Sequence, residues 1–199
     1  MRDPAFRARL IAEPPEKGHP FVNSLAGAYH KMFELGTPPD YEPGPEKSIA
    51  AQAKREGRNP DEIVYDMMME EDGRALIFFA MHNYTEGNLD NCLTMIRNPN
   101  TIFGLSDGGA HVGAICDVSV PTYMLTHWCR DRSRGERLDL SFVIRSQTKD
   151  TAEAVGLRDR GVVAPGYKAD RNVIDFDRLQ LPQPRMVYRS EERRVGKQW

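Results

Sequence analysis

Long apolar runs and an excess of one charge are both missing from this 199-residue chain. Its longest uninterrupted apolar run, Ala75 to Met81, is too short to span a bilayer. Lysine and arginine number 27 against 29 aspartate and glutamate residues, which leaves a formal net charge of -2. The N-terminus, M-R-D-P-A-F-R-A-R-L, lacks the apolar stretch of a secretory signal. We therefore expect no membrane partner and no nucleic-acid partner.

Cysteine and histidine are also scarce, and neither occurs at metal-ligand spacing. The three cysteines, Cys92, Cys116 and Cys129, form no C-x-x-C pair, and the histidines form neither H-x-H nor H-E-x-x-H. Unpaired cysteines of this kind predict a reducing, cytoplasmic setting. The hydrophobic fraction of 40% and the charged fraction of 28% are ordinary for a globular domain.

Capping residues predict three helices in the first third of the chain. Asp3 and Pro4 are a cap and first helical position for a helix to Ala12. Apolar residues at helical spacing predict a second helix over 46–56, which a following glycine ends. Asn59-Pro60 begins a third, which Gly73 closes.

The middle of the chain alternates short apolar runs with amphipathic stretches. This pattern predicts strands and helices in turn, and therefore a parallel α/β sheet with right-handed crossovers. The expected elements are a strand over 75–81, a helix over 86–97, a strand over 101–105, and helices over 121–130, 139–147 and 151–155. Beyond residue 157 turn residues alternate with short β-type runs, which predicts a small appended β element.

The segment I-F-G-L-S-D-G-G-A-H-V-G carries the best candidate for chemistry. Reactive groups in parallel α/β folds collect where strands end, and the predicted strand ends next to Ser106 and Asp107. A carboxylate there can accept a proton from water or donate one to a leaving amine, and His111 can orient substrate or shuttle protons. The alternative is a turn with an ordinary aspartate cap and a surface histidine. Glycines that allow close backbone approach follow the aspartate: Gly108, Gly109 and Gly113.

Three other interpretations of this loop fit less well. A serine nucleophile elbow at Ser106 needs a helix at once and a histidine well downstream, and the glycines forbid the first. A phosphate cradle needs glycine where Ala110 stands, and Asp107 would repel phosphate. A complete metal site lacks residues at ligand spacing; His82 at the end of the preceding strand could reach the same edge, but a structural histidine is the favoured interpretation there.

Four stretches of the sequence resemble the N-acyl-D-amino-acid deacylases of the amidohydrolase superfamily. N-P-N-T-I-F-G-L-S-D-G-G-A-H-V-G is similar to the last barrel strand and loop of that family, and residues 145–179 are similar to its C-terminal ending. The other two stretches are D-Y-E-P-G-P-E-K-S-I-A and L-T-H-W-C-R-D-R. The resemblance implies the C-terminal portion of a (β/α)₈ TIM-type barrel of the metal-dependent hydrolase kind, running into a small β-sandwich.

The resemblance also implies the site and the reaction. Asp107 corresponds to the family's essential aspartate, which belongs to the metal site, activates a zinc-bound water and protonates the departing amine. Ser106, Gly108 and His111 would contact the substrate, a small N-acyl amino acid. The alternatives are an amidohydrolase acting on a cyclic amide or imide, a metal-free serine hydrolase using Ser106, and a non-catalytic fragment.

Two departures from the family pattern predict an incomplete enzyme. The family's H-x-H-x-D zinc ligands belong to earlier barrel strands that are absent here, so we expect this chain alone to be inactive. Arg171 stands where an apolar residue would suit a strand. The predicted divisions are a barrel part at 1–156, the start of the returning β-sandwich at 157–189, and a tail at 190–199 that resembles translated adapter sequence.

Overall fold

The computed structural model describes residues 3–14, 18, 23, 25–104 and 117–185. The chain divides into two units, one formed by residues 1–87 and 183–199 and the other by residues 88–182. No described helix is long and apolar enough to cross a membrane.

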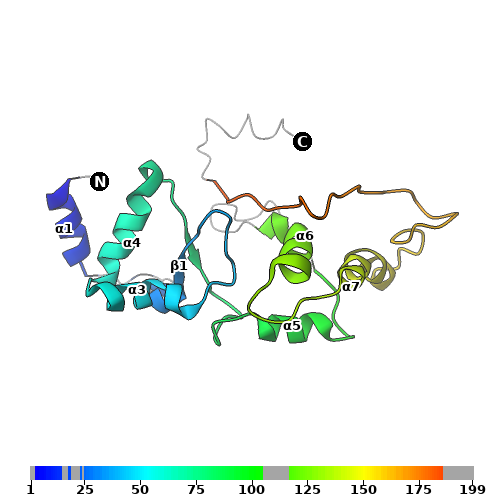
Figure 1. Ribbon diagram of the computed structural model, residues 1–199, viewed down its shortest axis with the longest axis horizontal. Coiled ribbons are helices and arrows are strands. Elements are labelled where there is room, and N and C mark those ends of the chain that lie inside the picture. The colour runs from blue at the N-terminus through cyan, green and yellow to red at the C-terminus, as the bar shows by residue number, and fades with distance from the viewer. Residues whose placement is uncertain (1–2, 15–17, 19–22, 24, 105–116, 186–199) are drawn as a thin grey trace. The chain divides into compact units, whose positions relative to one another are not determined.

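In its described part the first unit combines α-helices with a small sheet (Figure 1). Its elements are α1 (Pro4–Ala12), the 3₁₀ turn η1 (Tyr29–Lys31), β1 (Met32–Glu34), η2 (Pro45–Lys47), α3 (Ile49–Glu56), α4 (Pro60–Met69), η3 (Glu70–Asp72) and β2 (Ile77–Phe79). These helices confirm the predictions made from their caps. The Asp3 carboxylate accepts a hydrogen bond from the backbone N–H of Ala5, and the Asn59 side chain accepts one from that of Asp61. Gly57 ends α3 in the left-handed region at φ 64°.

The sheet of the first unit is antiparallel. β1 pairs with β2 in the register Met32–Phe79, Phe33–Phe78 and Glu34–Ile77. The predicted strand over 75–81 is therefore real but shorter, and each of its three residues is half-buried, not enclosed on both faces. β1 was not predicted, because three residues directly after a 3₁₀ turn carry no readable alternation.

Two apolar groups stabilise the first unit. Ile49 and Ile63 bring α3 and α4 together and are 0% and 1% exposed. On the sheet, the Phe33 ring lies 6.2 Å from both the Phe78 and the Tyr84 ring. Burying a side chain of this size contributes about 1.5–3 kcal/mol, so these contacts determine how the helices and the sheet pack.

The second unit is helical in its described part (Figure 1). Its elements are α5 (Asp90–Arg97), η4 (Asp117–Ser119), α6 (Val120–Tyr123), η5 (Met124–Asp131), α7 (Leu140–Arg145), η6 (Ser146–Asp150) and α8 (Thr151–Ala154). The predicted helices are all present, but η5 and η6 are π-helical and join their neighbours into longer helices. Periodicity at 3.6 residues cannot distinguish such π-helical turns from α-helix.

Two predicted β features are not found. Residues 101–104 form no strand, and residues 157–185 form turns and extended chain without a strand. A strand requires a hydrogen-bonded neighbour, and none lies beside either segment in the described chain. The parallel barrel sheet thus remains a prediction, since the sheet of the described residues is the antiparallel β1–β2 pair.

Candidate active site

The predicted site residues Ser106, Asp107, Gly108 and His111 lie outside the described residues. The structure therefore describes the chain on either side of them. Residue 104 is the last described position before them and residue 117 the first after them. Both positions belong to the second unit, and so do the elements described next.

One apolar cluster anchors the chain on both sides of the candidate segment. Phe103, directly before it, packs against this cluster, and so does Tyr123 in α6, directly after it. The buried members of the cluster are Leu93, Met124, Leu125, Trp128, Leu138 and Val143. The cluster thus holds Phe103 and Tyr123, which come before and after the candidate segment in the sequence.

η5 carries the L-T-H-W-C-R-D part of the sequence and has two ring contacts at its histidine. The His127 ring stacks on Tyr123 at 4.6 Å with 9° between the planes. It meets the ring of Trp128 edge-on at 5.5 Å. The wider π-helical turn is visible in the backbone bond from the Arg132 N–H to the carbonyl oxygen of His127, five residues earlier, at 2.8 Å. These contacts hold the imidazole in place at the surface of the cluster.

Arg132 is the only buried cation of the described chain, at 1% exposure. Its guanidinium lies 4.8 Å from the centre of the Trp128 ring. It donates hydrogen bonds to the Glu136 carbonyl oxygen at 2.8 Å and to the Asp90 carboxylate at 2.6 Å. A buried charge is costly unless it is paired in this way. Arg132 therefore joins α5 to the end of η5 and has a structural role.

Arg130 holds the extended C-terminal segment. Its guanidinium donates to the main-chain carbonyl oxygens of Phe176, Asp177 and Leu179. It also forms an ion pair with Asp131, and this hydrogen bond holds the pKa of the Asp131 carboxyl below its usual value. Because three carbonyl groups accept from one side chain, residues 176–179 remain in a fixed turn although they form no regular element.

Cys129 has the wrong environment for a nucleophile or metal ligand. Burial, with a smaller contribution from Asp139, raises the pKa of its thiol to about 11. The thiolate is the reactive and ligating form, so this thiol is inert near neutral pH. Its position against the apolar cluster gives it a packing role.

A zinc site does not assemble from the residues described. Among them, no three histidine, cysteine, aspartate or glutamate side chains are grouped so that they could hold a metal ion. His82, the histidine that the sequence placed near the same edge, is exposed in a bend after β2 and belongs to the first unit. The described residues by themselves thus do not fit a zinc ion.

The structure reveals one buried carboxylate that the sequence did not single out. Glu42 is 2% exposed and lies in the first unit. Its backbone N–H donates to the Asp40 carboxylate at 3.0 Å, and the Tyr84 hydroxyl donates to the neighbouring Pro43 carbonyl. The stretch D-Y-E-P-G-P was noted for its resemblance alone.

Comparison with known proteins identifies the family. A model of the amidohydrolase family matches residues 1–194. The chain belongs to this family. The amidohydrolase family consists of hydrolases that typically depend on a metal, so the expectation of a hydrolase is confirmed at that level. No curated protein and no solved structure matches the chain.

Proposed function

We propose that this amidohydrolase chain belongs to a zinc-dependent enzyme that hydrolyses the amide bond of N-acyl-(D-)amino acids. Two observations support the proposal. The family match extends over residues 1–194, and the segment G-L-S-D-G-G-A-H supplies a carboxylate flanked by glycines that allow close backbone approach to a ligand. The second observation, the carboxylate among glycines, is the reason for choosing Asp107 as the catalytic residue.

In this proposal Asp107 is the general acid and base. Hydrolysis forms a bond between a water oxygen and the carbonyl carbon and breaks the carbon–nitrogen bond. Asp107 accepts the proton that the water loses and donates it to the departing amine, so the carboxylate is regenerated in each cycle. Ser106, Gly108 and His111 would contact the substrate. A hydroxyl, an imidazole and a residue without a side chain next to the carboxylate suit a small polar substrate.

The proposed zinc ion would be held mainly by residues beyond those described. Asp107 alone cannot form a four-coordinate site, and the described residues add no cluster to it. Because Asp107 needs further metal ligands, we propose that the chain forms part of a (β/α)₈ barrel to which it contributes Asp107. A small β-sandwich element would follow the barrel part. Residues 1–156 would form the barrel part and residues 157–189 the start of the β-sandwich.

The first prediction concerns Asp107 in an enzyme completed with the metal-ligand strands. Asp107→Asn keeps the size of the side chain but removes its ability to transfer a proton. The substitution should lower kcat/KM by about 10²–10⁴ for N-acetyl-D-amino acids and leave the unfolding transition unchanged. Steady-state kinetics with matched thermal unfolding curves provide the measurement.

Ser106→Ala is the matched control, because it alters the neighbouring residue without touching the carboxylate. It should cost far less activity than Asp107→Asn. If the serine variant is inactive and the aspartate variant is not, the serine-hydrolase alternative is correct. A chelator separates the same two alternatives, since only a metal-dependent enzyme loses activity with it. Cyclic imides offered beside D- and L-acyl amino acids determine the substrate class.

A further inference from the structure

Helix α1 is attached to the first unit in an unusual way. None of its nine residues is buried. Its N-terminus is well formed, since Asp3 caps it and Pro4 occupies the first position. However, an isolated helix of this length is marginal in water. α1 therefore depends on its contacts with the rest of the unit to remain folded.

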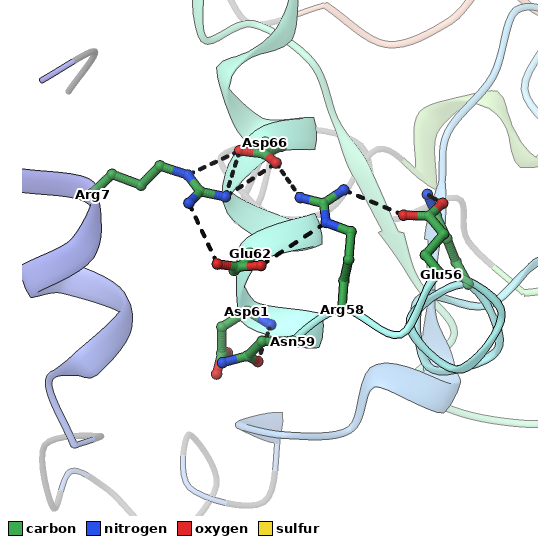
Figure 2. A network of polar contacts seen from close by, with 8 residues as sticks. Arg7, Glu56, Arg58, Asn59, Asp61, Glu62 and Asp66 are labelled. Carbon is green, nitrogen blue, oxygen red and sulfur yellow. Dashed lines mark hydrogen bonds and ion pairs between the residues drawn. The ribbon is translucent and has the colours of Figure 1, made fainter. Parts of the chain in front are cut away.

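Arg7 makes polar contacts from α1 to α4 (Figure 2). Arg7 donates to the Asp66 carboxylate through Nε at 3.1 Å and through Nη2 at 3.2 Å. Its Nη1 lies 3.5 Å from Glu62, and the guanidinium lies 5.5 Å from the centre of the Tyr65 ring. Arg7 thus joins α1 to Glu62, Tyr65 and Asp66 of α4.

The two carboxylates have a second cation that does not belong to α1. Figure 2 shows Arg58 on the opposite side of Glu62 and Asp66. Arg58 donates to Asp66 and lies 3.9 Å from Glu62, and it also pairs with Glu56 at 3.3 Å. Removal of Arg7 therefore leaves both carboxylates paired. α4 also keeps its own apolar attachment, because Ile63 is 1% exposed and packs against α3.

We propose that α1 is a releasable strap, held on α4 by the ion pairs of Arg7 and set free by salt while α4 remains folded. The side chains of Arg7, Glu62 and Asp66 are 30%, 34% and 46% exposed, so solvent ions reach them. Exposed pairs of this kind are weak individually and are screened by salt, since the Debye length falls from ~10 Å at 0.1 M to ~3 Å at 1 M. Release uncovers Tyr65 and the outer surface of α4.

Hydrogen exchange by mass spectrometry on the full chain tests the proposal, because detached α1 should unfold and lose protection. Exchange of residues 4–12 should become about 5–30-fold faster between about 0.02 M and about 1 M KCl. Exchange of residues 60–69 should stay constant. Arg7→Gln should give fast exchange of residues 4–12 at both salt concentrations, and Arg7→Lys, which keeps the charge but loses the bidentate geometry, an intermediate rate.

Arg9→Gln is the matched control. It removes the same charge from the same helix, but Arg9 contacts only the ring of Phe6 within α1. This variant should retain the slow exchange and the salt response of the wild-type chain. Equal effects of the two glutamine variants, or a wild-type rate that does not respond to salt, would refute the strap. Faster exchange in α4 together with α1 would refute it as well, because the whole unit would then be opening.

Discussion

The ionisation of the Tyr29 phenol makes the free energy of unfolding depend on pH in the alkaline range. Its hydroxyl donates to the Asp61 carboxylate, and burial together with this bond raises the pKa of Tyr29 to about 12 from 10.0. The folded state thus retains a proton that the unfolded state loses first. Its contribution to stability is complete below pH 10 and is lost as the pH rises to about 12. The stability advantage of the wild-type chain over Tyr29→Phe should therefore shrink between these values.

Urea unfolding of both chains at pH 8 and at about pH 11.5 measures this difference. Tyr167→Phe is the matched control, because it removes one phenol from a residue that is 41% exposed. A stability difference between wild type and Tyr29→Phe that does not vary with pH would contradict the prediction. Absorbance of the phenolate provides an independent measure of the same ionisation.

A second residue-scale prediction concerns Gly135, which lies against the buried arginine. A Cβ at position 135 would lie 2.6 Å from three guanidinium atoms of Arg132. The end of an arginine can usually move, but this one is held by Asp90, Glu136 and Trp128. Gly135→Ala should therefore destabilise the chain by about 1–3 kcal/mol, as overpacking does elsewhere. Chemical unfolding provides the measurement.

Gly104→Ala is the appropriate comparison for that substitution. Apart from its chain neighbours, no atom of the described residues lies within 4 Å of a Cβ built at position 104, so the alanine meets no obstacle among them. Its effect on the free energy of unfolding should be small. Similar losses from both variants would mean that the close approach to Arg132 is not what makes glycine necessary at position 135.

At the scale of elements, helices could be predicted from the sequence because their signals are local. Asp3-Pro4, Asn59-Pro60 and Gly57 each lie next to the backbone groups that they satisfy, and all three act as predicted. The helix predicted over 86–97 begins later, at Asp90. The residues before it, Asn88 among them, form a turn in which the Asn88 side chain accepts from the Asp90 N–H.

Strands were harder to predict because they depend on a partner far away in the sequence. Ile77–Phe79 was found from its apolar run, but its partner Met32–Glu34 was not. The strand predicted over 101–105 also rested on a short apolar run, yet no strand lies beside residues 101–104 in the described chain, and Phe103 packs on a helical cluster. An apolar run therefore does not by itself predict a ladder of hydrogen bonds.

At the scale of the whole molecule, the family was predictable and the site only in part. The segment with Asp107 supported the resemblance that the family match confirms at the level of an amidohydrolase. The burial of two charged side chains, Arg132 and Glu42, was not predictable. Arg132 is buried where it binds Asp90, and Glu42 is buried beside Pro43, whose carbonyl accepts from the distant Tyr84 hydroxyl. Sequence patterns indicate contacts between residues a few positions apart, whereas these contacts form only when distant elements pack together.

The last prediction is that the isolated chain self-associates. Apolar side chains are exposed along the segment that follows α8, with Val155 at 63%, Val163 at 78% and Val173 fully exposed. The main-chain bonds described there close a turn, from the Tyr167 N–H to the Ala164 carbonyl, and a longer loop, from the Lys168 N–H to the Asp159 carbonyl, and build no sheet. Exposed β-branched residues on unpaired backbone favour pairing between copies. Sedimentation should therefore show association that increases with concentration, and replacing Val163 and Val173 by Thr should reduce it. A monomer that unfolds cooperatively with ~5–15 kcal/mol would contradict this prediction.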